Sequence, residues 1–265
     1  MLIILLLCWI SCGSEVFGQS LFPTRMLGSV AAIGDSITQA FNAKYTEFGS
    51  CLYIDNPEYS FSTNTVSNST ISIAEHAIAY KGSAISTANF GADGARMTAG
   101  QDQAKEVKTW ALTQAAPRLI TVFLGHNDIC GGEEDKYQSS CPRNSQDPNN
   151  YCRTTTFYYE QKTREMLDVL ITIPDSQVAI IHPIRVSQIC NFKEEEVAEV
   201  WPVTLRCEDL WAAPELVGGT AVCPSLTDCS AERIADAYTT WVSYRDIVDR
   251  VVEEYNQYAA GQTVP

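Results

Sequence analysis

Three nearly uninterrupted apolar runs constrain the fold of this chain more than any other feature of its sequence. They cover residues 28–34, 118–125 and 177–186 and are rich in valine and isoleucine. Continuous hydrophobicity, without alternating polar residues, is typical of strands that are covered on both faces of a parallel sheet. A weaker fourth run, at 84–90, ends in a glycine-rich turn. We therefore expect a parallel sheet that contains these four strands.

Helical patterns lie between and after these runs. We expect helices over residues 100–115, 154–172 and 231–258, with Ser230 as the N-cap of the last one. Residues at helical spacing should form the buried stripes of the second and third helices: Tyr159, Thr163, Met166 and Leu170, then Ile234, Tyr238, Trp241, Val248, Val252 and Tyr255. Strands that alternate with helices predict an α/β fold with helices on both sides of the sheet. Three long segments should be irregular surface excursions: 45–70, 129–152 and 187–229.

Length and charge narrow the class of protein. The chain has 265 residues, which suits one α/β domain with a sizeable core. Its formal net charge of −14 disfavours nucleic acid and strongly anionic membranes as partners. The same charge is compatible with a neutral or zwitterionic substrate, and it leaves the oligomeric state open.

The first 18 residues have the pattern of a secretory leader. A short apolar core is followed by Val16 and Gly18 at the −3 and −1 cleavage positions, although no basic residue precedes the core. The apolar stretch is too short to span a membrane well. Lipidation at Cys12 is the second alternative, because Trp9 stands where lipoprotein signals usually have leucine. We therefore expect a secreted protein with a mature domain at 19–265.

The cysteine count fits export. The chain has ten cysteines, of which Cys8 and Cys12 belong to the leader, and an even number remains for disulfides. No close CxxC pair indicates a zinc site, and we expect no metal or cofactor. The cysteines cluster at 130–152 and 190–229, which suggests two separately stapled loops. Asn68 begins a glycosylation sequon, which is meaningful only in a eukaryotic source.

Three predicted strand ends carry residues suited to ester hydrolysis. In parallel α/β sheets, ligands bind beyond the carboxyl ends of the strands. Ser36 could attack a carbonyl and donate its own N–H, while Gly94, without a Cβ, lets its N–H approach the reacting carbon. Asn127 offers a side-chain amide as a further donor to the oxyanion. Together they would form a nucleophile and an oxyanion hole.

Each of these residues also has a structural interpretation. Ser36 could be a helix N-cap, Gly94 a turn glycine with positive φ, and Asn127 a brace within a loop. Asp35 and Asp128 are expected to bond to backbone N–H groups around their turns. A single Gly-Asp-Ser triplet does not separate these readings, but three blocks in order favour catalysis.

These blocks resemble the SGNH (GDSL-type) hydrolase family. The matching stretches are GDSIT at 34–38, NFGADG at 89–94 and GHND at 125–128. The resemblance implies a flavodoxin-like three-layer sandwich, hydrolysis of carboxylic esters, and an oxyanion hole formed by Ser36, Gly94 and Asn127. The stretch LITVFLGHNDIC, which precedes cysteine-bearing loops, is similar to the phospholipase B-like branch.

One part of the family pattern is missing. The family supplies its base in an Asp-x-x-His block near the C-terminus, and no such string occurs in these 265 residues. Of the three histidines, His126 is expected to line the pocket, His182 to lie in the core, and His76 to lie on the outer face of a short helix. We expect the last strand and the catalytic loop to lie beyond Pro265, and the chain alone to show little turnover.

The sequence therefore predicts a secreted serine esterase or lipase acting on a lipid, phospholipid or acylated glycan. A transient contact with a membrane surface is compatible with such a substrate. The alternative, from another functional class, is a catalytically inactive relative that binds a lipid or glycan.

Overall fold

The structure is a computed structural model that describes residues 27–40, 56–65, 71–131, 153–192, 194, 196–200, 203–206, 223–226 and 229–259. The predicted leader, the sequon at Asn68 and most of the three excursions lie outside these ranges. Four cysteines of the predicted mature domain also lie outside them: Cys51, Cys141, Cys152 and Cys207.

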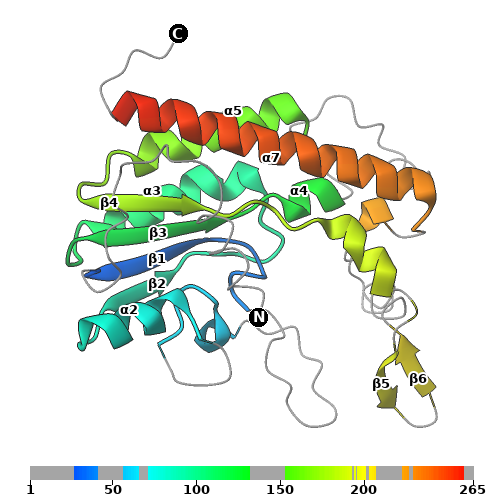
Figure 1. Ribbon diagram of the computed structural model, residues 1–265, viewed down its shortest axis with the longest axis horizontal. Helices are drawn as coiled ribbons and strands as arrows, with labels where there is room; N and C mark the ends of the chain where they lie inside the picture. Colours follow the sequence, from blue (N-terminus) through cyan, green and yellow to red (C-terminus); the bar gives the residue numbers. More distant parts are fainter. Residues whose placement is uncertain are drawn as a thin grey trace.

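Four parallel strands form the central sheet (Figure 1). They are β1 (Ser29–Gly34), β2 (Ser86–Asn89), β3 (Arg118–Phe123) and β4 (Ser176–Ile180). Their spatial order, β2-β1-β3-β4, matches the first four positions of the flavodoxin-like order. All four predicted strands are confirmed. The strand predicted at 177–186 is β4, which ends at Ile180, earlier than predicted, because Pro183 lacks the N–H that the next hydrogen bond of the ladder needs.

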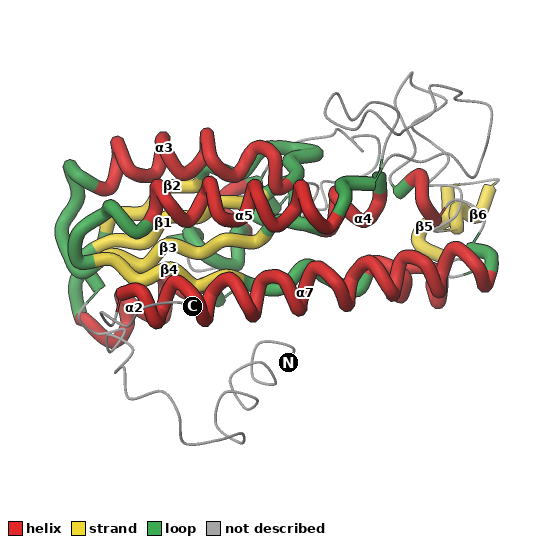
Figure 2. The backbone as a smooth tube through the Cα atoms, turned by 90° about the horizontal axis from the view of Figure 1, so that it is seen from above, coloured by secondary structure: helices red, strands yellow, loops and turns green. Residues whose placement is uncertain are grey.

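Helices cover both faces of this sheet and give the predicted layered α/β class. They are α2 (Ile73–Lys81), α3 (Gly100–Ala111), α5 (Thr156–Leu170) and α7 (Ala231–Ala259), while the short α4 (His126–Cys130) lies beyond the carboxyl ends of the strands. Ile33 and Val122 belong to one large apolar cluster with α3, α5 and α7, whereas Val30 packs on the opposite face with Ala77 of α2. Figure 2 shows α3 and α5 on one side of the strands, and α7 runs beside β4.

Short elements complete the described chain. The 3-10 turns are η2 (Pro57–Tyr59), η3 (Met97–Ala99), η4 (Val186–Phe192) and η5 (Pro224–Leu226). An antiparallel hairpin, β5 (Glu196–Val200) and β6 (Val203–Arg206), lies in an excursion that was expected to be irregular. The carboxyl ends of the sheet strands point toward α4 and this hairpin (Figure 1).

The buried face of α7 differs from the predicted stripe. Its buried apolar residues are Ala237, Tyr244, Ile247, Val248 and Val251. Tyr238 is 40% exposed, and the other predicted positions, apart from Val248, only flank the buried line. α7 is rotated about its own axis relative to the prediction. The reason is that Tyr244 stacks on Tyr159 of α5, with ring centroids 3.9 Å apart, and donates its hydroxyl hydrogen to the Thr154 carbonyl. By contrast, the predicted stripe of α5 is buried throughout.

Two disulfides are described, and one joins the two predicted cysteine clusters. Cys130 at the end of α4 pairs with Cys223, and Cys190 pairs with Cys229. The expectation that each cluster staples its own loop is therefore wrong for Cys130. The reason is spatial, since α4 and η5 are adjacent and Ser225 Oγ donates to the Ile129 carbonyl at 3.0 Å.

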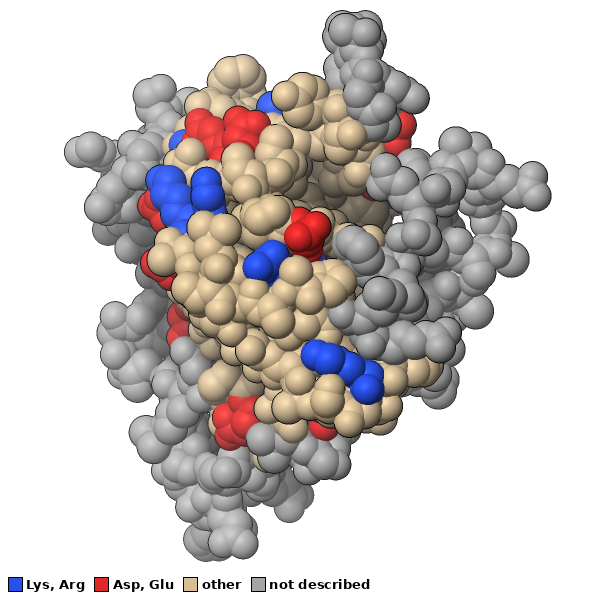
Figure 3. All heavy atoms as spheres, turned by 90° about the vertical axis from the view of Figure 1, so that its left-hand side faces the viewer, with Lys and Arg blue, Asp and Glu red and all other residues tan. Residues whose placement is uncertain are grey.

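Although the chain is strongly acidic overall, Lys and Arg lie close to Asp and Glu on the described surface at the amino ends of the strands (Figure 3).

Charged side chains join α5 to α7, an arrangement that we call the Glu160 clamp. On α5, Glu160 accepts hydrogen bonds from Arg250 of α7 at 2.9 and 2.6 Å and from Arg164 at 2.9 Å. These bonds, those from Arg250 above all, lower the pKa of Glu160 from 4.5 to about 2.

The Glu160 clamp should make stability depend on pH. A carboxyl whose pKa is lower in the folded state stabilises fully above its unfolded value, and this contribution disappears as the pH falls toward 2. Since the side chain is 26% exposed, we expect Glu160→Gln to cost about 1 kcal/mol at pH 6 and much less at pH 2.5. Urea unfolding at both pH values measures this, with Glu106→Gln, at an exposed position of α3, as the control. An equal cost at both pH values would contradict the clamp.

Candidate active site

The carboxyl ends of β1 and β2 are tied together directly. The N–H of Ala92, in the second block, donates to the Gly34 carbonyl at 3.1 Å. Asn89 at the end of β2 donates its amide to the Thr38 carbonyl at 2.8 Å. The first and second blocks are therefore held side by side at one edge of the sheet.

Asn127 closes this arrangement from the end of β3. It lies in the first turn of α4, and its Nδ2 donates to Asp35 Oδ2 at 2.8 Å and to the Ala95 carbonyl at 3.0 Å. These partners are the chain neighbours of Ser36 and Gly94. The structure thus brings the three predicted residues to one place, with both amide hydrogens of Asn127 engaged by the protein.

Ser36 lies half-buried in the turn that follows β1. Residues 36–40 form turns, whereas the N-cap interpretation of Ser36 would place the start of a helix here. Asp35 satisfies this turn, because its Oδ1 accepts from Ile37 N at 2.9 Å and its carbonyl accepts from Gln39 N at 3.0 Å. Within the described part of the chain, the Ser36 hydroxyl has no hydrogen-bond partner.

Gly94 is exposed and adopts φ = +65°. That conformation favours glycine, as the turn interpretation requires. A Cβ at this position would meet no atom within 4 Å, so the space beside its backbone is open. Both interpretations of Gly94 are compatible with this geometry.

Gln103 of α3 is a positioning residue that the sequence reasoning missed. Its Oε1 accepts from Gly34 N at 3.0 Å, and its Nε2 donates to Gly34 O at 2.9 Å. It is buried and fixes the backbone two residues before Ser36. The sequence does indicate that Gln103 is buried, because it lies on the same helical face as Val107 and Ala111, which are both buried.

Replacing Gln103 should destabilise the strand end. We expect Gln103→Met to lower the free energy of unfolding by about 2 kcal/mol, because the buried Gly34 N–H loses its acceptor. Chemical denaturation measures this, and Gln101→Met on the same helix should change stability by less than about 0.5 kcal/mol. Equal stability of the two variants would show that Gln103 holds nothing in place.

The two aspartates of the blocks bond to backbone N–H groups, as expected. Asp35 accepts from Ile37, and Asp128 accepts from Met97 N at 2.8 Å and from Thr154 Oγ1 at 2.6 Å. Burial raises the pKa of Asp128, and the hydrogen bonds from Thr154 and Met97 act against that rise. Both carboxylates are fully buried and brace the strand ends.

The histidines fall in three different settings. His126 is only 4% exposed, so it is packed inside, where a pocket-lining position was expected; its Nε2 lies against Asp35 Oδ2. The prediction that His182 lies in the core is wrong, since its side chain is 42% exposed and its Nε2 is 2.8 Å from Asp249 Oδ1 on α7. It lies outside the core because β4 ends two residues earlier. His76 is exposed on α2, as expected.

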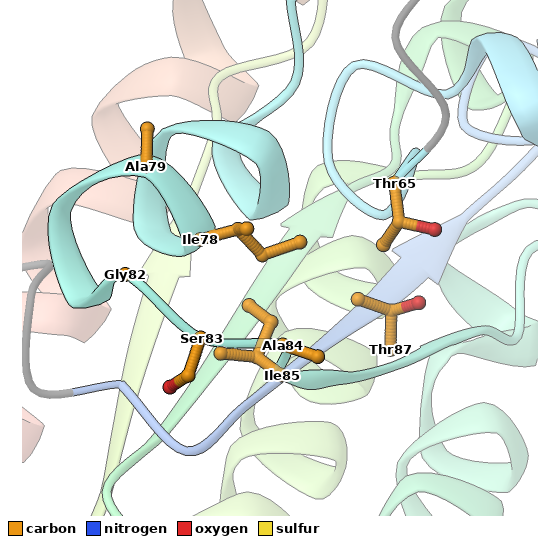
Figure 4. A pocket seen from close by; sticks show the side chains of 8 residues that line it. All are labelled: Thr65, Ile78, Ala79, Gly82, Ser83, Ala84, Ile85 and Thr87. Carbon is orange, nitrogen blue, oxygen red and sulfur yellow. The ribbon is translucent and has the colours of Figure 1, made fainter.

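A hollow elsewhere on the molecule does not belong to this site. It lies between α2 and the beginning of β2, where Ile78, Gly82 and Thr87 are among its lining residues (Figure 4). That is the amino end of β2, opposite to the end that carries the three blocks. The described ranges contain no cluster of three His, Cys, Asp or Glu side chains suited to a metal ion. None of the described helices is long and apolar enough to cross a membrane.

Comparisons with known proteins point to one family. The model of the GDSL-like Lipase/Acylhydrolase family matches residues 30–210, which contain all three blocks. Among curated proteins, the search found no match. A crystal structure of a member of the lipolytic protein G-D-S-L family from Veillonella parvula DSM 2008 is 14% identical. It matches 81% of this chain and 96% of that one with a TM-score of 0.32.

Proposed function

Because this chain belongs to the GDSL-like lipase/acylhydrolase family, we propose that it is a serine esterase with Ser36 as its nucleophile. The observation that carries the proposal is the bridging amide of Asn127, which joins the neighbours of Ser36 and Gly94 at one sheet edge. The half-buried hydroxyl of Ser36 supports it, since this hydroxyl has no hydrogen-bond partner among the described residues and Asp35 already caps the turn.

The proposed reaction is acyl transfer in two steps. Ser36 Oγ forms a bond to the ester carbonyl carbon while a base takes its proton, and the carbonyl oxygen becomes an anion. The N–H groups of Ser36 and Gly94 and the amide of Asn127 stabilise that oxyanion. The C–O bond to the alcohol then breaks, the alcohol leaves with a proton, and water releases the acid from Ser36.

The residue that acts as the base toward Ser36 has to be identified by experiment. The family pattern Asp-x-x-His does not occur in the 265 residues, and the rings of His126 and His182 already contact Asp35 and Asp249. Turnover should therefore be measured for this chain and for the full coding region side by side. A gain in the latter would locate the base outside the given residues.

The substrate class that we propose is a lipid, phospholipid or acylated glycan ester, handled by an exported enzyme of the phospholipase B-like kind. Support comes from the similarity of the stretch LITVFLGHNDIC and from two disulfides, which suit an oxidising compartment. A binding protein without activity would have no need of a serine at this strand end beside a bridging asparagine.

Labelling with a fluorophosphonate separates an enzyme from a binding protein. We expect the probe to modify one peptide, the one that contains Ser36, and an excess of p-nitrophenyl butyrate to slow the labelling. Comparison of acetyl, butyryl and octanoyl esters then ranks the acyl length. A folded protein that binds phospholipid vesicles or acetylated glycan but leaves the probe unreacted would favour the binding alternative.

A further inference from the structure

His126 occupies an unusual place for a polar side chain. It is 4% exposed and packs its ring against Phe123, with centroids 4.8 Å apart. Its Nε2 lies against Asp35 Oδ2, yet both ring nitrogens, Nε2 and Nδ1, are buried without a hydrogen-bond partner among the described residues. A buried imidazole placed against one carboxylate oxygen calls for an explanation, since burying unsatisfied polar atoms costs free energy.

The same carboxylate oxygen holds the proposed oxyanion donor. Asp35 Oδ2 accepts from Asn127 Nδ2 at 2.8 Å, and the other amide hydrogen of Asn127 goes to the Ala95 carbonyl at 3.0 Å. To donate to a substrate oxyanion, Asn127 must release one of these two acceptors. Asp35 is a carboxylate in a fully buried position, and hydrogen bonds to an ionised acceptor are about twice as strong as neutral ones.

Two other charged groups belong to this neighbourhood, Asp128 and Arg96, and both His126 and Arg96 interact electrostatically with Asp128. Asp128, on the same helix as His126, is bonded to Met97 and Thr154. Arg96, from the segment after β2, interacts electrostatically with Asp128. Asp35 is the carboxylate that His126 contacts directly, and it is also the carboxylate that holds Asn127.

We propose that His126 is a positioning residue for the oxyanion hole, which rests on the proposed esterase function. A proton on His126 Nε2 partly neutralises Asp35 Oδ2, so that this oxygen binds the Asn127 amide less tightly. Asn127 can then turn one amide hydrogen to the oxyanion as it develops, while Asp35 keeps its bond to the Ile37 N–H. His126 touches neither the substrate nor Ser36 in this role.

Two substitutions of His126 by amide side chains of different length test this role. Glutamine places an amide nitrogen near the position of Nε2, whereas asparagine is too short to reach Asp35 Oδ2. We expect His126→Gln to lower the rate of Ser36 phosphonylation and kcat for p-nitrophenyl butyrate less than threefold. His126→Asn should lower both by about tenfold or more, with little change in KM, because full loss of one oxyanion donor costs about 10²–10³.

Thermal melting of both variants shows whether folding is equally affected. Equal rates for the two variants in a reactive protein would overturn the role of His126 and leave the esterase proposal intact. A wild-type protein that does not react at Ser36, in the given chain or in the full coding region, would overturn the esterase proposal and the release of Asn127 with it.

A second measurement does not depend on turnover. The chain has three histidines, so nitrogen-15 NMR of the imidazoles can be assigned by replacing His76 and His182 in turn. We expect the proton of neutral His126 on Nε2, and we expect its resonance to move in Asp35→Asn while that of His76 does not. A proton found on Nδ1, with Nε2 bare, would overturn the proposal even in an active enzyme.

Discussion

Ser36→Ala is expected to lower ester turnover by about 10⁴-fold or more, because the acyl-enzyme can no longer form. The comparison is made in whichever form of the protein turns over p-nitrophenyl butyrate. KM should change little, since the oxyanion donors and the walls of the site are unaltered. Any remaining rate would reflect binding and the oxyanion hole alone.

The structure makes this a clean substitution. Ser36 is half-buried, and its hydroxyl has no hydrogen bond within the described residues, so its loss should shift the melting temperature by no more than about 2 °C. Ser62 is a contrasting control, because it is buried, shares a 2.7 Å hydrogen bond with Thr121 within β3, and belongs to none of the three blocks. Ser62→Ala should lower stability and leave kcat nearly unchanged. Full activity of Ser36→Ala would remove Ser36 from the chemistry.

Removing the Cys130–Cys223 disulfide should have the largest effect on stability. The two residues are 93 apart in sequence, and a crosslink that closes a loop of this length contributes about 4.5 kcal/mol by chain entropy. The double variant Cys130→Ala with Cys223→Ala should therefore unfold at a much lower urea concentration. A decrease in the free energy of unfolding of less than about 1 kcal/mol would show that this disulfide contributes little to stability.

The second disulfide provides a matched comparison. Cys190 and Cys229 are 39 apart, so their removal should cost only slightly less, about 4 kcal/mol. Their effects on activity should differ, because Cys130 ends the short helix that begins next to Asn127. Under conditions where both variants stay folded, removal of Cys130–Cys223 should lower kcat more. The reverse order would contradict a site that is braced through α4.

The parts of the fold that the sequence predicted are those governed by local patterns. Near-continuous apolar runs mark buried parallel strands, so β1 and β3 were predicted within one or two residues of their ends. The stripe of α5 was predicted because one side of that helix faces the sheet. The stripe of α7 was misjudged because its orientation is decided by a distant partner, the ring of Tyr159.

What the sequence did not predict depends on contacts between distant residues. The hydrogen bonds between Gln103 and Gly34 join residues that are 69 apart in the sequence, and the Cys130–Cys223 disulfide joins residues that are 93 apart. The exposure of His182 followed from a strand end that Pro183 brings forward. At the candidate site, the three blocks were predicted from their order, but the engagement of the Asn127 amide by Asp35 required coordinates.

The central claim is that the ends of β1, β2 and β3 surround a single reacting carbonyl. A crystal structure of the Ser36 adduct with a fluorophosphonate tests it most directly, because the phosphoryl oxygen mimics the oxyanion. We expect that oxygen about 2.7–3.1 Å from the N–H groups of Ser36 and Gly94 and from Asn127 Nδ2, which will have left Asp35 or Ala95. A phosphoryl oxygen turned to solvent, with Asn127 still bonded to both, would contradict the claim.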